Sequence, residues 1–81
     1  MLLFTQIGGD GLYHRLRSLR EVRNLKQRDL AAYLNCSQQV YSNYELGQRD
    51  IPTEVLIKLS LLYEVSTDYL LGITDDPKPN R

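Results

Sequence analysis

Two helical patterns in the middle of the chain are separated by only three residues, and this short interval constrains the fold more than any other feature. The first pattern, Gln27 to Leu34, ends before Asn35, one of the few non-glycine residues that tolerates the left-handed conformation of a sharp turn. Ser37 is a favourable N-cap for a second helix that extends to Leu46, with Gly47 after it. The sequence therefore predicts two short helices joined by a tight turn.

Three more helices are predicted by apolar spacing and by capping residues. One runs from Tyr13 to Val22, one begins at Pro52, and one runs from Ser66 to Leu71, with Gly72 as its stop. The predicted core residues recur at intervals of three and four: Leu12, Leu16, Leu19, Leu30, Ala31, Leu34, Val55, Leu56, Leu59, Leu62 and Tyr63. The fold class expected is all-α, in a single domain, because 81 residues supply only one small core.

The domain is expected to span residues 12–72, between an N-terminal arm of residues 1–11 and a flexible C-terminal tail of residues 73–81. The arm is apolar at its start, and three alternatives remain open for it: packing on the domain, pairing with a second chain, or disorder. No segment is long and apolar enough to span a membrane or to serve as a signal peptide. A cytoplasmic protein without a membrane partner is expected.

Catalytic and metal-binding chemistry is not favoured by the residue types present. The chain has one cysteine, Cys36, and one histidine, His14, and its carboxylates show no metal-ligand spacing. Cys36 is expected to be a small buried apolar residue and His14 a solvated surface group. An enzyme, a cofactor and a metal site are therefore not expected.

The formal charge is zero in total but is unevenly distributed. Residues 1–49 carry a net charge of +3 and residues 50–81 a net charge of −3. The first part of the chain is thus suited to face a polyanion, although a split of this size also arises by chance in a short chain.

The helix from Ser37 to Leu46 carries the strongest functional signal. On a helical wheel, Tyr41 and Tyr44 share one side and are expected to anchor the helix in the core. The opposite side and the exposed first turn then present uncharged polar groups: Gln38, Gln39, Ser42 and Asn43. An amide offers a donor and an acceptor together and so matches the adenine edge in the major groove of DNA. A solvated polar face is the plainer interpretation, but the tight turn before this helix favours a helix-turn-helix that binds DNA.

The stretch from Leu16 to Gly72 resembles the Cro/phage-repressor type of helix-turn-helix domain, the XRE family. The resemblance rests on an ordered set of short matches: Leu19-Arg20, Leu25, Gln27, Leu30-Ala31, Leu34, Ser37, Tyr41 to Glu45, Gly47, Val65-Ser66 and Asp68 to Gly72. It implies a compact lambda-repressor-like five-helix bundle that binds double-stranded DNA as a homodimer. The function it implies is a sequence-specific transcription regulator, expected to be a repressor.

The resemblance also implies residue roles. Gln38 and Gln39 match positions that contact base edges, and Asn43 matches a further position that contacts a base or a phosphate. Ser42 and Asn43 lie on the outward side of the same helix, and both are expected to contact bases as well. The phosphate contacts are expected from Gln27, Arg28, Gln48 and Arg49. Arg20 and Glu45 match an ion pair that ties the first predicted helix to the recognition helix.

Three positions depart from the family pattern: Lys26 replaces a threonine cap, Asn35 a turn glycine, and Val40 a small polar residue. Val40 is expected either to contact a thymine methyl group or to pack against the preceding helix. A second hypothesis is a protein-interaction module with a polypeptide partner. Ile57 and Leu61, four residues apart, could form its contact patch or a dimer interface, or else complete the core.

Overall fold

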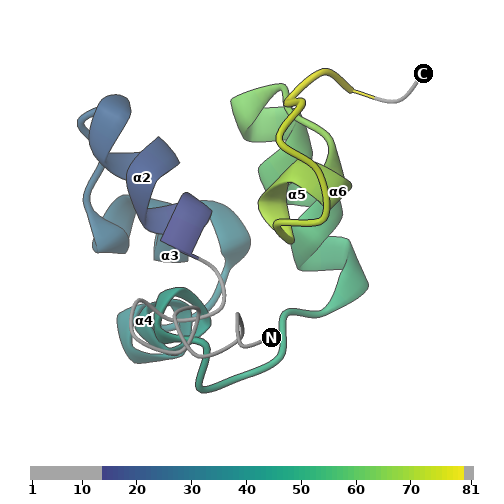
Figure 1. Ribbon diagram of the computed structural model, residues 1–81. Coiled ribbons are helices and arrows are strands. Elements are labelled where there is room, and N and C mark those ends of the chain that lie inside the picture. Colours follow the sequence, from purple (N-terminus) through teal and green to yellow (C-terminus); the bar gives the residue numbers. More distant parts are fainter. Residues whose placement is uncertain (1–13, 80–81) are drawn as a thin grey trace.

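A computed structural model describes residues 14–79, and this part of the chain is all-helical, as predicted. The helices are α2 (His14–Val22), α3 (Gln27–Leu34), α4 (Gln38–Leu46), α5 (Thr53–Tyr63) and α6 (Thr67–Leu70). Figure 1 shows α2, α3 and α4 gathered on one side and α5 with α6 on the other, joined by the segment after α4. The predicted arm of residues 1–11 lies outside the described residues, as do Leu12 and Tyr13 at the start of the first predicted helix.

The tight turn between α3 and α4 has the predicted capping geometry. Asn35 adopts the left-handed conformation, with φ 58° and ψ 47°, and ends α3. The Ser37 hydroxyl accepts a hydrogen bond from the Val40 N–H at 3.1 Å, which satisfies one of the free amides at the start of α4. Gly47, with φ 73°, ends α4. The predicted turn and both of its neighbouring helices are confirmed.

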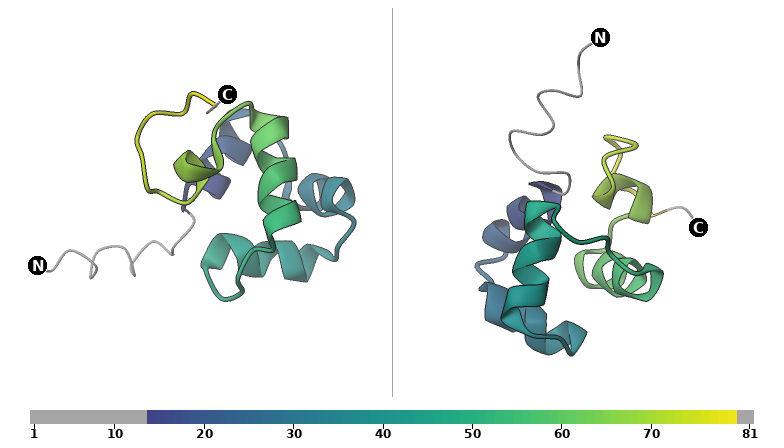
Figure 2. Two further views of the ribbon diagram at one scale, coloured as in Figure 1. Left: turned by 90° about the vertical axis from the view of Figure 1, so that its right-hand side faces the viewer. Right: turned by 90° about the horizontal axis from the view of Figure 1, so that it is seen from below.

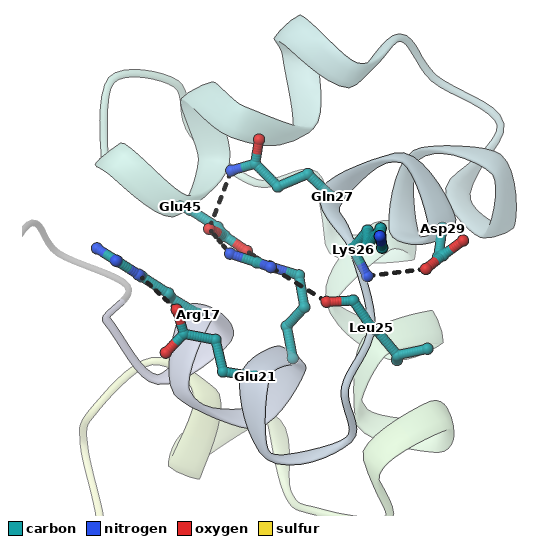
Figure 3. A network of polar contacts seen from close by, with 8 residues as sticks. Arg17, Glu21, Leu25, Lys26, Gln27, Asp29 and Glu45 are labelled. Carbon is teal, nitrogen blue, oxygen red and sulfur yellow. Dashed lines mark hydrogen bonds and ion pairs between the residues drawn. The ribbon is translucent and has the colours of Figure 1, made fainter.

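The start of α3 is capped by Asp29, a residue without a predicted role. Lys26 has no side-chain acceptor and its side chain makes no capping hydrogen bond. Instead, the Asp29 carboxylate accepts a hydrogen bond from the Lys26 N–H at 2.8 Å (Figure 3). A carboxylate in the first turn also interacts favourably with the helix dipole.

The starts of the last two helices differ slightly from the prediction. Pro52, expected as the first helical residue, is the N-cap of α5 and has extended ψ, so α5 begins at Thr53. Ser66 caps α6 through a hydrogen bond from the Tyr69 N–H, at 3.0 Å. α6 ends at Leu70 rather than Leu71, and Gly72, with φ 80°, follows in a left-handed turn. Such one-residue differences are usual at helix ends.

The core is formed by the predicted apolar faces together with the two tyrosines of α4. Leu16, Leu30, Tyr41, Leu59 and Leu70 are at most 1 % exposed. Around them lie the other buried side chains: Ala31, Leu34, Tyr44, Tyr63 and Val65. The core therefore draws on all five described helices and fixes α4 against α2 and α3. No helix within residues 14–79 has the length and apolar character needed to cross a bilayer.

The segment after α6 is fastened to α2 by Arg15. The Arg15 guanidinium donates to the Tyr69 carbonyl at 2.8 Å and to the Asp75 carboxylate at 2.6 Å, and it also bonds the Thr74 carbonyl. It lies 4.0 Å from the centre of the Tyr69 ring, a cation–π geometry. Figure 2 shows this segment running beside α6. The flexible tail that the sequence predicts for residues 73–81 stays a prediction.

Candidate DNA-binding surface

The orientation of α4 is set by two tyrosines on its inner face. Tyr41 is 0 % and Tyr44 5 % exposed, and their rings meet edge to face with centroids 6.4 Å apart. Large rings packed in this way fix the rotation of a helix about its own axis. The opposite face of α4 is therefore turned outward in a defined orientation.

The four residues predicted to contact bases lie on α4. Gln38 and Gln39 are exposed, whereas Ser42 and Asn43 are half-buried. Gln39 Nε2 donates a hydrogen bond to Asn43 Oδ1 at 3.2 Å, one helical turn further along. These four residues thus present amide and hydroxyl groups on α4, and none of the four is charged.

A bidentate ion pair ties α2 to α4. Arg20 Nε donates to Glu45 Oε2 at 2.6 Å and Arg20 Nη2 to Glu45 Oε1 at 3.1 Å. The third donor, Arg20 Nη1, bonds the Leu25 carbonyl in the turn between α2 and α3, also at 3.1 Å (Figure 3). This is the pair that the resemblance implies, and one guanidinium joins α2 to α4 and to the turn that leads into α3.

Glu45 is charged in this environment. Burial raises the pKa of its carboxyl, but hydrogen bonds from Arg20 and Gln27 act in the opposite direction, and the pKa is lowered overall. The same hydrogen bonding to Glu45 raises the pKa of Arg20. The Tyr41 hydroxyl also lies near this carboxylate, and it has no hydrogen-bond partner within residues 14–79.

Gln27, predicted to contact phosphate, also takes part in this network. Its Nε2 donates to Glu45 Oε1 at 3.2 Å (Figure 3). The remaining amide proton and the carbonyl oxygen of Gln27 stay available to another partner. Nothing in the local sequence indicates this bond, because its two residues are 18 positions apart.

The other predicted phosphate contacts are exposed. Arg28 lies in the first turn of α3, and Gln48 and Arg49 lie in the segment between α4 and α5. The ion pairs within residues 14–79 do not include Arg28 or Arg49. No carboxylate within residues 14–79 therefore holds either guanidinium group.

Comparison with known proteins decides the family. Residues 16–70 match the family model HTH_3, described as Helix-turn-helix. The chain belongs to the helix-turn-helix family. Its matched residues include α3, α4 and the turn between them, so they form a DNA-binding domain of the transcription-regulator type.

Relatives of this helix-turn-helix chain occur in Bacillus subtilis (strain 168). It is 46 % identical over 66 residues to the HTH-type transcriptional regulator ImmR, covering 82 % of this chain and 52 % of ImmR. It is 42 % identical over 65 residues to the HTH-type transcriptional regulator YobD, covering 80 % of this chain and 58 % of YobD. The chain thus spans about half the length of these two relatives.

Two apolar residues of this helix-turn-helix domain, Val40 and Leu46, also lie on α4. Val40 is half-buried and packs against the core. Leu46, at the end of α4, is 55 % exposed.

Groups with catalytic or metal-binding chemistry do not gather in the part of the chain that the structure describes. No three histidine, cysteine or carboxylate side chains there are placed to hold a metal ion. His14 is exposed and Cys36 is a free, half-buried thiol beside the core. The family to which this domain belongs is one of DNA-binding regulators.

Proposed function

We propose that the protein is a repressor that binds a specific DNA sequence by inserting α4 into the major groove. The observation that carries this proposal is the outward row of amides on α4, held in place by two buried tyrosines and by the Arg20–Glu45 pair. A helix fixed in this way holds its hydrogen-bonding groups in one position relative to the base edges.

Gln38, Gln39, Ser42 and Asn43 contact bases in this proposal, because they lie on the presented side of α4. Arg28, Gln48 and Arg49 bind phosphates, as does the unused half of the Gln27 amide. Arg28 and Gln27 lie in the first turn of α3, where free backbone N–H groups and the helix dipole also favour an anion. Phosphate contacts position the helix, and the base contacts select the sequence.

The proposed mode of repression is occupancy of the site, in the cytoplasm and without a cofactor. A domain bound in the major groove blocks other proteins from the same base pairs, so no chemical step is needed. The names of the two relatives support regulation of transcription.

The proposed assembly is a homodimer on two-fold related half-sites. Ile57 and Leu61 on α5 are 49 % and 58 % exposed, four residues apart, and form an apolar patch on one face of that helix. A substitution of Leu61 by glutamate is expected to lower the dimer fraction in sedimentation velocity.

The experiment that tests this function is selection of bound sequences from a random duplex pool. We expect a two-fold motif with half-sites about 10 base pairs apart, centre to centre. Titration of the selected duplex at two salt concentrations should show affinity falling with salt at a slope of about −0.9 per phosphate contact. Absence of any enriched motif would contradict the proposal.

The second candidate function is a protein-interaction module, favoured by the exposed Ile57 and Leu61 and by the zero net charge. The same selection experiment distinguishes the two candidate functions. Weak binding without sequence preference would favour the interaction module, whereas an enriched two-fold motif favours the repressor.

A further inference from the structure

The hydrogen bond between Gln39 and Asn43 links two of the side chains proposed to contact bases. Gln39 Nε2 donates to Asn43 Oδ1 at 3.2 Å, and the two residues are one turn apart on α4. Gln39 is exposed, but Asn43 is half-buried beside Tyr44, which lies in the core. The half-buried Asn43 amide therefore restricts the more exposed Gln39 amide.

This bond determines which polar atoms remain for DNA. Gln39 has one N–H engaged in this bond and keeps its Oε1 acceptor and its second N–H donor. Asn43 has one lone pair of its carbonyl oxygen engaged and keeps the second lone pair and both N–H donors. Two side chains that are similar in chemistry thus differ in what remains: a free acceptor with one donor at Gln39, and two free donors with a partly engaged acceptor at Asn43.

Each pattern fits a different base edge in the major groove. Adenine offers a donor at N6 and an acceptor at N7, which complements Gln39. Guanine offers acceptors at N7 and O6, which complement the two donors of Asn43. We propose that Gln39 and Asn43 read two neighbouring base pairs as one hydrogen-bonded unit, with adenine facing Gln39 and guanine facing Asn43. This inference rests on the proposed function.

Asn43 thus has two roles, a base contact of its own and a positioning role through Gln39. An exposed glutamine side chain loses rotamer freedom when it binds, and a partner that orients it beforehand reduces that loss. The predicted consequence is that a change at Asn43 alters base preference at two positions of the site.

The test uses Asn43→Asp and Asn43→Ala, with selection repeated for each variant of the full chain. The aspartate keeps an acceptor for Gln39 Nε2 but replaces the two donors by acceptors, which suit the N4 amino group of cytosine. We expect Asn43→Asp to retain adenine at the pair read by Gln39 and to change guanine to cytosine at the neighbouring pair. Asn43→Ala should reduce both preferences, each by about 5- to 150-fold in affinity ratio.

Asn24→Asp is the matched control for the added negative charge. Asn24 lies in the turn after α2 with φ 60°, a conformation that aspartate also tolerates. Its substitution introduces the same charge outside α4 and is expected to select the same motif as the unchanged protein. The base pair read by Gln39 is identified as the position at which Gln39→Ala loses preference.

The outcomes distinguish this inference from the function on which it rests. If the unchanged protein selects no motif, the proposed function fails and the coupled reading with it. If it selects a motif but Asn43→Ala leaves the preference at the Gln39 position intact, the coupled reading alone is overturned. Should Asn43→Asp bind too weakly for selection, the Asn43→Ala result decides.

Discussion

Glu45 is the one buried charged residue among residues 14–79, and its partners Arg20 and Gln27 connect α4 to α2 and α3. Replacing Glu45 by glutamine removes the charge and leaves Arg20 without its bidentate acceptor. We expect the free energy of unfolding at pH 7 to fall by about 2 kcal/mol, within the range for a lost hydrogen-bond partner. Urea unfolding followed by circular dichroism measures this. Glu21→Gln is the control, because its exposed pair with Arg17 contributes little.

The same substitution is expected to change the pH dependence of stability. The pKa of Glu45 is lowered in the folded state, since hydrogen bonds outweigh the effect of burial. Its stabilising contribution is therefore present above the pKa of the unfolded chain and is lost as pH falls through the folded pKa. The unchanged protein should lose stability in acid more steeply than Glu45→Gln. Equal slopes for the two proteins would contradict a charged Glu45 in the native state.

Tyr63 provides a prediction for the alkaline range. Burial raises its pKa to about 12, and its hydroxyl has no hydrogen-bond partner within the described residues. The contribution of the neutral, buried Tyr63 side chain to the free energy of unfolding is present below pH 10, the ordinary pKa of tyrosine. It is lost between pH 10 and 12. Tyr63→Phe should be as stable as the unchanged protein at pH 7, or more so, and should unfold at higher pH in an alkaline titration.

The control for Tyr63 is Tyr33→Phe. The Tyr33 hydroxyl donates to the Lys58 carbonyl at 2.9 Å, so its removal is expected to cost about 1 kcal/mol at pH 7. A larger loss at Tyr63 than at Tyr33 would show that the Tyr63 hydroxyl has a partner in solution.

Gln39 and Arg49 are expected to differ in the kind of DNA affinity that they contribute. Gln39→Ala should cost about 1–3 kcal/mol on the selected site and relax preference at one base pair, because it removes a base contact. Arg49→Ala should weaken all duplexes similarly and reduce the salt slope by about 1, because it removes a phosphate contact. Fluorescence anisotropy with selected and scrambled duplexes measures both. Equal losses from Gln39→Ala on the two duplexes would contradict a base contact.

At the scale of the helices, the turn between α3 and α4 depends on the Ser37 cap. Ser37→Ala removes the acceptor for the Val40 N–H and is expected to lower the free energy of unfolding by about 1 kcal/mol. Ser18→Ala, in the exposed middle of α2, is the matched control and should be neutral or slightly stabilising. Chemical denaturation of both variants gives the comparison.

Helices and their inner faces were predictable because they are encoded locally. Leu30, Ala31 and Leu34 repeat with the period of a helix, and Asn35 and Ser37 have conformational and capping preferences of their own. The outward side of α4 followed from the same periodicity once Tyr41 and Tyr44 were placed inside.

Contacts between distant residues were not predictable in this way. The Gln27–Glu45 bond joins residues 18 apart, and the Arg15 contacts reach 54 to 60 residues along the chain. No local propensity encodes such pairs, since they exist only after the helices have packed. The resemblance supplied Arg20–Glu45 because a family pattern carries long-range information that one sequence lacks.

At the scale of the whole molecule, Arg15 holds the segment after α6 in place. Arg15→Ala is expected to release residues 74–77, because the guanidinium is their main attachment to α2. The Ser66 N–H, which donates to the Pro77 carbonyl at 3.0 Å, should then exchange faster with solvent. Hydrogen exchange measured by NMR gives this rate.

Arg17→Ala is the control for Arg15, since Arg17 lies on the same helix and is paired only at the surface. It should leave the exchange of the Ser66 N–H unchanged. Fast exchange of that amide already in the unchanged protein would instead support the flexible tail that the sequence predicts.

The attachment at Arg15 also fixes where the polypeptide leaves the domain. The last described residues lie on the side of the molecule away from α4 in Figure 1 and in the left view of Figure 2. Any polypeptide that continues beyond this point would therefore leave from the side of the domain opposite α4, the helix proposed to enter the major groove. A second domain attached there could differ in size without obstructing the approach of α4 to the major groove.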